Sequence, residues 1–323
     1  MPITTTPLQS KEMMKIGIDI GGTKCAVVLG DDTHVEKKIK FPTTTCEETL
    51  KNIIRAVSEI GEGDAIGISC GGPLDAGRGI ILSPPNLPGW DEIHITEMLT
   101  EKFGIPAYLC NDANAGALAE WKYGAGKGTN SMVFMTFGTG LGAGIILDGR
   151  LINGISGMAG EIGHVRLASD GPVGYGKRGS AEGFCSGGGL AQIGRSLAQE
   201  RLKQGKPLPY CNCEDDVSRI DARLLAEWAR LGDEVGLESY RISGEMLGRC
   251  AAILIDLLNP EAIVIGSVFA RAEDLLRPHM ERILEQEALE ISRKACRILP
   301  AQLGESIGDF AALAVAFEGG KTV

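Results

Sequence analysis

The sequence predicts an α/β protein of two domains with mixed sheets. Three observations carry this prediction. The chain has 323 residues, a length that suits about two domains. Segments with strand and helix patterns alternate along it, and such alternation is typical of α/β architecture. Two strand–glycine turn–strand units, near residues 14–29 and 132–147, are well separated in the sequence.

The first half of the chain begins with strand patterns. Apolar runs at 14–18 and 25–29 are joined by a tight glycine turn, and a third strand is expected near 36–40. A helix is expected at 47–60, because apolar residues recur there at helical spacing. Further strands are expected at 65–69 and 107–110, and further helices at 93–103 and 111–121.

The second half begins with a strand at 132–137, a glycine-rich turn at 138–144 and a strand that ends at Asp148-Gly149, a hairpin signal. Asp221 and Ser243 are each expected to cap a helix with an apolar stripe. The remaining expected elements are a strand at 262–265 and helices at 190–204, 275–289 and 309–318. The last helix is expected to return to the first domain, since chain ends often lie close together.

Composition excludes several classes of protein. The net charge is −10 and no basic stretch occurs, so nucleic acid is not an expected partner. No apolar run reaches the roughly 18 residues of a membrane span. The nine cysteines have no disulfide spacing, and no signal peptide precedes the first strand. We therefore expect reduced thiols and a cytoplasmic location, with a mobile tail over residues 1–14.

The first glycine turn carries groups that suit a polyphosphate. Backbone N–H groups of Gly21 and Gly22, the Thr23 hydroxyl and the Lys24 ammonium can converge on one point, and the Asp19 carboxylate suits Mg²⁺. The turn lacks the GxxxxGK[ST] pattern and leads from strand to strand, so it is not a Walker loop. A charged hairpin tip without a ligand is the alternative.

The second turn repeats this arrangement. Gly138, Gly140 and Ala143 fit a loose dinucleotide pattern, but that pattern must open a helix, whereas a strand follows here. We therefore exclude a Rossmann site. Together the two turns resemble two halves of a clamp around one nucleotide.

Four polar side chains have both a functional and a structural interpretation. Asp112 follows a strand and is either a general base or a helix cap. Asn86 lies in a rigid loop of three prolines and either binds a carbohydrate or lies on a plain surface loop. Glu161 and His164 are three residues apart, a spacing that puts both on one side of a helical turn. The alternative for these two is that they are solvated or structural, as lone Glu and His residues usually are.

In combination these motifs resemble the ROK family of sugar kinases, within the actin/hexokinase-like ATPase superfamily. The resemblance covers about residues 15–318 and rests on the segments 19–24, 85–90, 111–114, 136–144 and 160–164 in family order. It implies a two-domain ribonuclease H-like, actin-like ATPase fold with mixed sheets and an interdomain cleft. The expected domains are 15–128 with 306–323, and 129–305.

The resemblance also implies an activity, the ATP-dependent phosphorylation of a hexose at a primary hydroxyl, with glucose as the first candidate. Kinases of N-acetylmannosamine, N-acetylglucosamine or fructose are alternatives. From another class, a non-catalytic sugar-binding regulator remains, although only about 14 residues precede the first strand and a DNA-binding helix-turn-helix needs more. A homodimer is implied as well.

Site residues carry over by position. Asp112 resembles the catalytic base. The implied sugar-binding residues are Gly72, Asn86, Asn111, Asp112, Glu161, His164 and Glu182. The implied nucleotide-binding residues are Asp19, Gly21, Gly22, Thr23, Lys24, Gly138, Thr139, Gly140, Gly266 and Ser267, with Asp19 binding Mg²⁺ through water. Ser267 departs from the run of glycines usual in the adenosine loop.

A larger departure concerns zinc. Most family members continue from the histidine into a C-x-C-G-x-x-G-C-x-E motif, but Val173, Tyr175 and Ser180 stand at its thiolate positions. Structural zinc needs four good ligands, so none is expected here. We expect packing by Tyr175 and hydrogen bonds to orient His164 instead. The alternative is a metal bound outside the motif by Cys185, Cys211 or Cys213.

Overall fold

A computed structural model describes residues 13–319, so most of the expected tail at 1–14 lies outside the described residues. The described chain forms two compact units. The first runs to Asp112 and resumes at Gly308, and the second is Ala113–Ile307. The expected change of domain at 128–129 lies one helix later in the chain than the boundary between these units.

The first unit is built on a five-stranded mixed sheet in the order β3-β2-β1-β4-β7. Its strands are β1 (Lys15–Ile20), β2 (Lys24–Gly30), β3 (Val35–Pro42), β4 (Ile66–Cys70) and β7 (Ala107–Asn111). β1 pairs antiparallel with β2 but parallel with β4. The predicted mixed sheet is thereby confirmed. A short hairpin of β5 (Leu74–Asp75) and β6 (Ile80–Ile81) follows β4.

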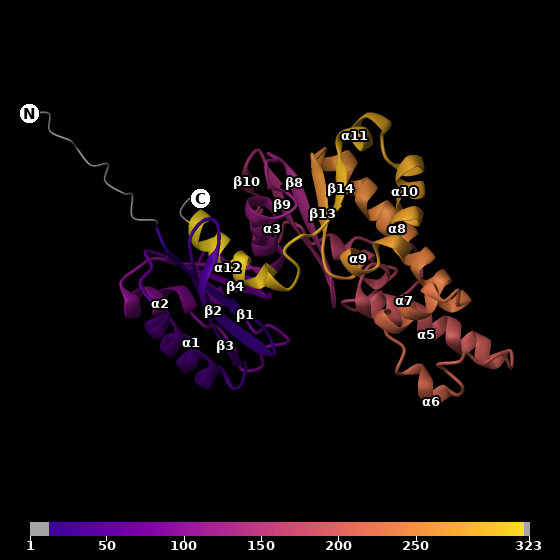
Figure 1. Ribbon diagram of the computed structural model, residues 1–323, viewed down its shortest axis with the longest axis horizontal. Helices are drawn as coiled ribbons and strands as arrows, with labels where there is room; N and C mark the ends of the chain where they lie inside the picture. Colours follow the sequence, from indigo (N-terminus) through magenta and orange to yellow (C-terminus); the bar gives the residue numbers. More distant parts are fainter. Residues whose placement is uncertain (1–12, 320–323) are drawn as a thin grey trace, which may run out of the picture. The chain divides into compact units, whose positions relative to one another are not determined.

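Helices α1 (Cys46–Ile60), α2 (Ile95–Phe103) and α12 (Ile307–Glu318) belong with this sheet. α12 comes from the end of the chain, and Figure 1 draws it in yellow beside the indigo strands. Glycines allow it to pack closely. A Cβ at Gly17 of β1 would lie 2.9 Å from Ala312, and a Cβ at Gly67 of β4 would collide with the α12 backbone.

The second unit has its own five-stranded mixed sheet, in the order β10-β9-β8-β13-β14. Its strands are β8 (Met132–Phe137), β9 (Leu141–Leu147), β10 (Arg150–Leu151), β13 (Ala262–Ile265) and β14 (Arg297–Pro300). β8 pairs antiparallel with β9 and parallel with β13. In each unit, the first two strands of the five-stranded sheet are therefore joined by a glycine turn.

Helix α3 (Asp112–Tyr123) packs on this second sheet through small residues. A Cβ at Gly116 would lie 2.6 Å from the Phe134 ring, and a Cβ at Gly144 would lie 2.5 Å from Ala117. Further along, the buried Glu120 carboxylate accepts hydrogen bonds from the backbone N–H groups of Ala125, Gln302 and Leu303, at 2.8 to 3.2 Å. These contacts explain why α3 groups with the second unit.

The rest of the second unit is mainly helical. It contains α4 (Ala181–Phe184), α5 (Gly187–Lys203), α6 (Glu214–Val217), α7 (Ala222–Arg230), α8 (Glu234–Leu258), α9 (Val268–Arg271), α10 (Glu273–Glu287) and α11 (Glu290–Ala295). The 3₁₀ turns η1 (Ile162–His164) and η2 (Gly304–Ser306) and the ribbon of β11 (Val173–Gly174) and β12 (Lys177–Arg178) complete it. α8 and α10 pack where glycines allow it, since a Cβ at Gly248 would lie 2.7 Å from Ile283.

One predicted helix cap is confirmed and one is wrong. Asp221 caps α7 by accepting from the Leu224 backbone N–H at 2.7 Å. Ser243 does not cap a helix, because α8 begins at Glu234 with Asp233 as its cap. Ser243 lies inside α8 and is fully buried, and its hydroxyl donates to the Phe184 carbonyl at 2.8 Å.

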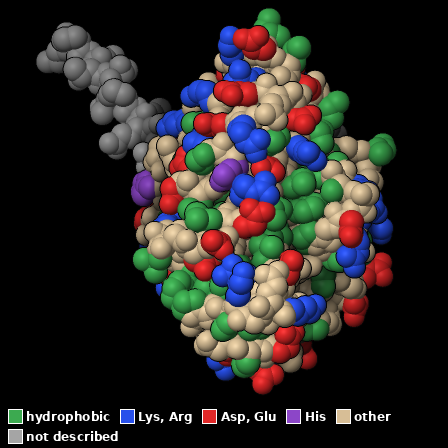
Figure 2. Space-filling view, turned by 90° about the vertical axis from the view of Figure 1, so that its right-hand side faces the viewer, with side chains coloured by type: hydrophobic (Ala, Val, Ile, Leu, Met, Phe, Trp, Pro, Cys, Tyr) green, Lys and Arg blue, Asp and Glu red, His purple; other side chains and the backbone are tan. Residues whose placement is uncertain are grey.

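Two properties of the surface bear on possible partners. Figure 2 shows acidic and basic side chains interspersed over one face, with hydrophobic side chains gathered between them. Several charged side chains of the described residues form ion pairs, for example Arg230 with Asp274 and Arg241 with Glu238. Within residues 13–319, no helix is both long and apolar enough to cross a bilayer.

Candidate active site

The first glycine turn is fixed by one hydrogen bond within the turn and by a second one from Thr43. The Gly21 N–H donates to the Lys24 carbonyl at 3.1 Å and closes the turn, while the Thr43 hydroxyl donates to the Gly21 carbonyl at 2.6 Å. Gly22 lies against Asn86, because a Cβ there would lie 2.8 Å from the Asn86 carbonyl oxygen. The turn predicted to hold phosphate is therefore adjacent to the loop predicted to hold sugar.

Asp19, on β1, lies in an acidic environment. The pKa of its carboxyl is raised to about 6, chiefly by burial and also by the nearby charges of Asp309 and Asp112, while Lys38 and Lys24 act in the opposite direction. Gly308 makes close packing possible, since a Cβ there would collide with the Asp19 carboxylate. A bound cation would relieve this accumulation of negative charge.

The acidic groups around Asp19 suit Mg²⁺ that is bound partly through water and phosphate. Among residues 13–319, no three or more His, Cys, Asp or Glu side chains are arranged to hold a metal ion by themselves. Mg²⁺ commonly takes one or two carboxylates, several waters and substrate phosphates. The Asp19 carboxylate suits such a water-mediated role.

The predicted sugar residues of the first unit gather around Gly71 and Gly72, which follow β4. A Cβ at Gly71 would lie 3.7 Å from the Asp112 carboxylate and 3.8 Å from the Asn86 amide nitrogen. A Cβ at Gly72 would lie 3.4 Å from the Asn111 amide nitrogen. β4 and β7 run parallel with Cys70 opposite Asn111, so the carboxyl ends of neighbouring strands present these groups together.

The loop that carries Asn86 is anchored in the core. Trp90 is fully buried, and its carbonyl accepts from the Ser83 N–H at 3.0 Å. Leu87 is also buried, and its N–H donates to the Pro84 carbonyl at 2.9 Å. The loop is therefore a fixed platform for Asn86.

In the second unit, the side chain of Glu182 contacts the second glycine turn. It belongs to the first turn of α4, and its carboxylate accepts from the Leu141 N–H at 3.1 Å. A Cβ at Gly163 would lie 3.4 Å from the Glu182 Cβ, so Glu182 also lies beside the 3₁₀ turn of His164. Glu161 directly precedes that turn, and its carbonyl accepts from the His164 N–H at 3.1 Å.

His164 is oriented by its neighbours. Its ring packs edge-on against Tyr175 with the ring centroids 5.0 Å apart, and the Lys177 ammonium donates to its backbone carbonyl at 2.5 Å. The predicted packing of Tyr175 on His164 is confirmed.

Val173 and Ser180, at the other two thiolate positions of the zinc motif considered above, also have structural roles. The Val173 N–H donates to the Gln192 side-chain oxygen at 3.0 Å, and the Gln192 amide donates back to the Val173 carbonyl at 2.8 Å. Ser180 caps α4 by accepting from the Gly183 N–H at 3.2 Å. These groups do not fit zinc, which needs four good ligands.

A cavity of about 810 Å³ opens beside the second glycine turn. Gly138 and Thr139 line one part of it, together with Gly187 and Gly188 of α5. The Gly187 N–H donates to the Gly138 carbonyl at 2.8 Å, which joins the turn to the start of that helix. Backbone N–H groups at a turn and a helix start suit phosphate oxygens.

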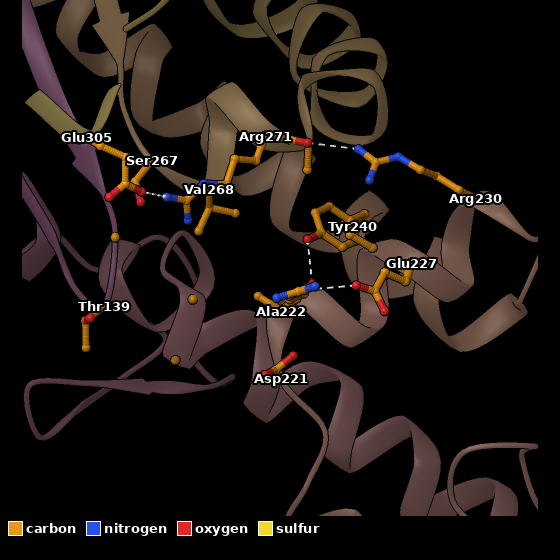
Figure 3. A pocket seen from close by; sticks show the side chains of 16 residues that line it. Thr139, Asp221, Ala222, Glu227, Arg230, Tyr240, Ser267, Val268, Arg271 and Glu305 are labelled. Atoms are coloured by element: carbon orange, nitrogen blue, oxygen red, sulfur yellow. Dashed lines mark hydrogen bonds and ion pairs between the residues drawn. The ribbon is translucent and has the colours of Figure 1, made fainter. Parts of the chain in front are cut away.

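The rest of the cavity combines apolar and charged side chains, as Figure 3 shows. The Tyr240 hydroxyl donates to the Ala222 carbonyl at 2.8 Å, and Arg271 pairs with Glu305 at 3.3 Å. Apolar atoms that could pack against a base come from Ala222, Ala226, Tyr240, Val268 and Ala272. The cavity thus offers a polar end for phosphate and an apolar wall for a base.

Ser267 lines the same cavity and has an unusual backbone conformation. It follows β13 and Gly266, with a φ of +50° and a ψ of −104°. This is a region that favours glycine. Ser267 therefore adopts a conformation that glycine would adopt more readily.

Sequence reasoning missed the charged residues of this cavity. Arg223, Glu227, Arg230, Arg271 and Glu305 all line it. The spacing of Arg223 and Glu227, four apart on α7, indicates only an exposed ion pair on a helix.

The predicted residues thus form two groups, one in each compact unit. The first contains the Gly21–Gly22 turn, Asp19, Gly72, Asn86, Asn111 and Asp112. The second contains the Gly138–Gly140 turn, Glu161, His164, Glu182, Gly266 and Ser267.

Comparison with known proteins identifies the family. Residues 15–318 match the ROK family. A glucokinase of Thermotoga maritima is 32% identical over 84% of this chain and 87% of its own length. The ROK hexokinase of Thermus thermophilus superposes with a TM-score of 0.79, 29% identity and coverage of 96% of this chain and 99% of that one. A ROK family glucokinase from Streptomyces griseus, in complex with glucose and AMPPNP, gives a TM-score of 0.74, 31% identity and coverage of 95% and 100%.

The chain belongs to the ROK family, and its two-unit α/β architecture is the actin-like ATPase fold of these sugar kinases. Relatives with other activities are similar too. An N-acetylmannosamine kinase of Citrobacter koseri is 30% identical over 85% of this chain and 90% of its own length. A xylose repressor of Caldicellulosiruptor bescii is 31% identical over 84% of this chain and 70% of its own length.

Proposed function

We propose that this protein is an ATP-dependent hexose kinase that phosphorylates a primary hydroxyl, with glucose as its substrate. The observation that carries the proposal is the gathering of Asp112, Asn111 and Asn86 around Gly71 and Gly72, next to the first glycine turn. This constellation places a carboxylate among amide groups able to bind sugar hydroxyls. Membership of the ROK family supports it.

Each group has a defined task in this reaction. Asp112 is the general base that takes the proton of the sugar hydroxyl and directs its oxygen toward the γ-phosphorus. Gly72, Asn86, Asn111, Glu161, His164 and Glu182 bind the remaining sugar hydroxyls. Hydrogen bonds from such groups fix the orientation of the hydroxyl that reacts.

The nucleotide is bound by the glycine turns and the cavity beside the second one. Gly21, Gly22, Thr23 and Lys24 hold one part of the triphosphate, and Gly138, Thr139 and Gly140 hold the other. Gly266 and Ser267 contact the adenosine. When bound through water to Asp19, Mg²⁺ supplies positive charge that offsets the charge of the phosphates.

N-acetylmannosamine, N-acetylglucosamine and fructose are the alternative substrates. They differ from glucose by a few polar groups, and discrimination between them depends on the shape of the pocket. The similarity to an N-acetylmannosamine kinase keeps the amino sugars in the test. We further propose that the enzyme is a cytoplasmic homodimer.

A sugar-binding regulator without catalytic activity is the second candidate, favoured by the similarity to a xylose repressor. The carboxylates of Asp19 and Asp112 favour the kinase, because a protein that only binds sugar needs neither a base nor a metal-binding carboxylate.

ADP production with MgATP tests the proposal against glucose, mannose, fructose, N-acetylmannosamine and N-acetylglucosamine. We expect turnover with one of these sugars, glucose above the others. Thermal stabilisation by a sugar without any ADP production would overturn the kinase in favour of the regulator.

A further inference from the structure

A buried amide lies close to the proposed base and takes no part in the mechanism above. Asn114 is the third residue of α3, which begins with Asp112, and its side chain is 4% exposed. Its amide nitrogen donates to the side-chain oxygen of Asn153 at 3.3 Å. Its own oxygen is buried and has no hydrogen-bond partner among residues 13–319.

Asn153 stands at the base of the loop that leads to Glu161. Its carbonyl accepts from the Ala159 N–H at 3.0 Å, which closes the loop over residues 153–159. At the other end, the Gly160 carbonyl accepts from the Ala143 N–H of β9 at 2.9 Å. The loop base is therefore tied to β9 through Gly160 and to α3 through the side chain of Asn153.

The rest of this loop has little else to hold it. Ile155 is fully exposed and Met158 is half-exposed, so its apolar side chains do not pack into a core. Gly154, Gly157 and Gly160 all have positive φ, at 69°, 75° and 92°. Glycines add conformational freedom. The hydrogen bond from Asn114 to Asn153 therefore helps to fix the position of the loop that leads to Glu161.

The energetics of Asn114 favour a positioning role over a stabilising one. A buried acceptor without a partner costs stability, and an apolar side chain of similar volume would avoid that cost. Asn153 is only partly buried, so water can replace Asn114 as its partner.

We propose that Asn114 is a positioning residue of the sugar site. Through Asn153 it holds the loop that carries Glu161 against the helix that begins with the catalytic Asp112. The inference rests on the proposed sugar kinase function, which assigns Glu161 to the sugar.

The test compares two substitutions with opposite expected effects. Asn114→Leu removes both the hydrogen bond and the unpaired acceptor, so it should unfold at the same or a higher urea concentration while the KM for the sugar rises about tenfold. Asn114→Asp keeps an acceptor to which a reoriented Asn153 amide can donate. It should lose stability, because it buries a charge, yet keep a sugar KM within about twofold of the wild type. The KM for ATP should change in neither.

Asn153→Ala supplies the matched control from the other side of the bond. It should raise the sugar KM to the same extent as Asn114→Leu, and the double variant should show no further rise, because both changes break one interaction. Independent effects that multiply in the double variant would overturn the proposal. So would an unchanged sugar KM in Asn114→Leu, or a parallel loss of stability and affinity in that variant.

Hydrogen exchange separates this inference from the proposed function. Amides of residues 154–161 should exchange faster in Asn114→Leu than in the wild type, whether or not the protein phosphorylates a sugar. Unchanged exchange there would show that the hydrogen bond between Asn114 and Asn153 does not hold the loop in place. If the wild-type protein phosphorylates no sugar, the proposed function is refuted, but the effect of Asn114 on the loop can still be measured by hydrogen exchange.

Discussion

The imidazole of His164 packs edge-on against the phenol ring of Tyr175, with the ring centroids 5.0 Å apart and the ring planes at 80°. Tyr175 stands at one of the three thiolate positions of the zinc motif that the family resemblance implied. This aromatic contact restricts the orientation of the imidazole. Unlike a metal bond, it is weak and leaves most of Tyr175 exposed.

Removing this ring should weaken sugar binding. Aromatic edge contacts contribute about 0.5–1.5 kcal/mol, so Tyr175→Ala should raise the KM for the sugar about two- to tenfold. The KM for ATP should stay constant, and steady-state kinetics measures both. Tyr175→Phe retains the ring and serves as the control, with constants close to those of the wild type. Equal losses in both variants would mean that the hydroxyl, and not the ring contact, matters.

The backbone of Ser267 offers a second prediction. Its φ of +50° costs a residue with a Cβ about 1–2 kcal/mol, whereas glycine adopts it freely. Ser267→Gly should therefore stabilise the folded protein by about 0.5–1 kcal/mol after the entropic cost of glycine, with no loss of affinity for ATP. Urea unfolding and the KM for ATP provide the measurements.

Ser267→Ala is the matched control for this backbone effect. It removes the hydroxyl but keeps the Cβ, so its free energy of unfolding should not exceed that of the wild type. Stabilisation by alanine as large as that by glycine would show that the conformation is not the cause.

A pH-dependent contribution to stability is expected from Asp31, in the turn between β2 and β3. Burial raises the pKa of its carboxyl, but hydrogen bonds from the Thr33 hydroxyl and from the backbone N–H groups of Thr33 and His34 outweigh burial and lower the pKa to about 2. Because the pKa is lower in the folded state than the roughly 3.9 of an unfolded chain, the stabilisation is present above about pH 4 and is lost as the pH falls toward 2.

Asp31→Asn should accordingly destabilise the protein by about 1–2 kcal/mol at pH 7, and by less at pH 3. Urea unfolding at both pH values measures the difference. Asp32→Asn changes an exposed neighbour of the same charge and should have little effect at either pH. A destabilisation by Asp31→Asn that is the same at both pH values would rule out this electrostatic origin.

Features set by local chemistry could be predicted from the sequence. The glycine turns between β1 and β2 and between β8 and β9 follow from adjacent residues, and so does the cap of α7 by Asp221. Ser243 shows where local reasoning fails. Its partner is the Phe184 carbonyl, 59 residues away, and no pattern near Ser243 announces that contact.

The site shows the same division. Motifs marked the glycine turns and the Asn111-Asp112 pair, because each is a short contiguous segment. Two other features depend on packing between distant segments. They are the contact between Asn86 and Gly22 and the two hydrogen bonds between Gln192 and Val173. The stretch at 154–189 has no helical or strand periodicity, so its short elements β11, β12 and α4 could not be predicted.

The role of Asp112 makes the sharpest prediction about catalysis. Asn keeps the shape of the side chain and can still bind the sugar hydroxyl, but it cannot take a proton. Asp112→Asn should therefore lower kcat by about 10²–10⁴-fold while the affinity for the sugar, measured by calorimetry, changes little. Asp75→Asn, a carboxylate on β5, is a matched control that should leave kcat unchanged. If Asp112 were only the first residue of α3, its replacement would lower stability in urea and leave kcat near the wild-type value. A folded Asp112→Asn protein with near-normal turnover would exclude Asp112 as the base.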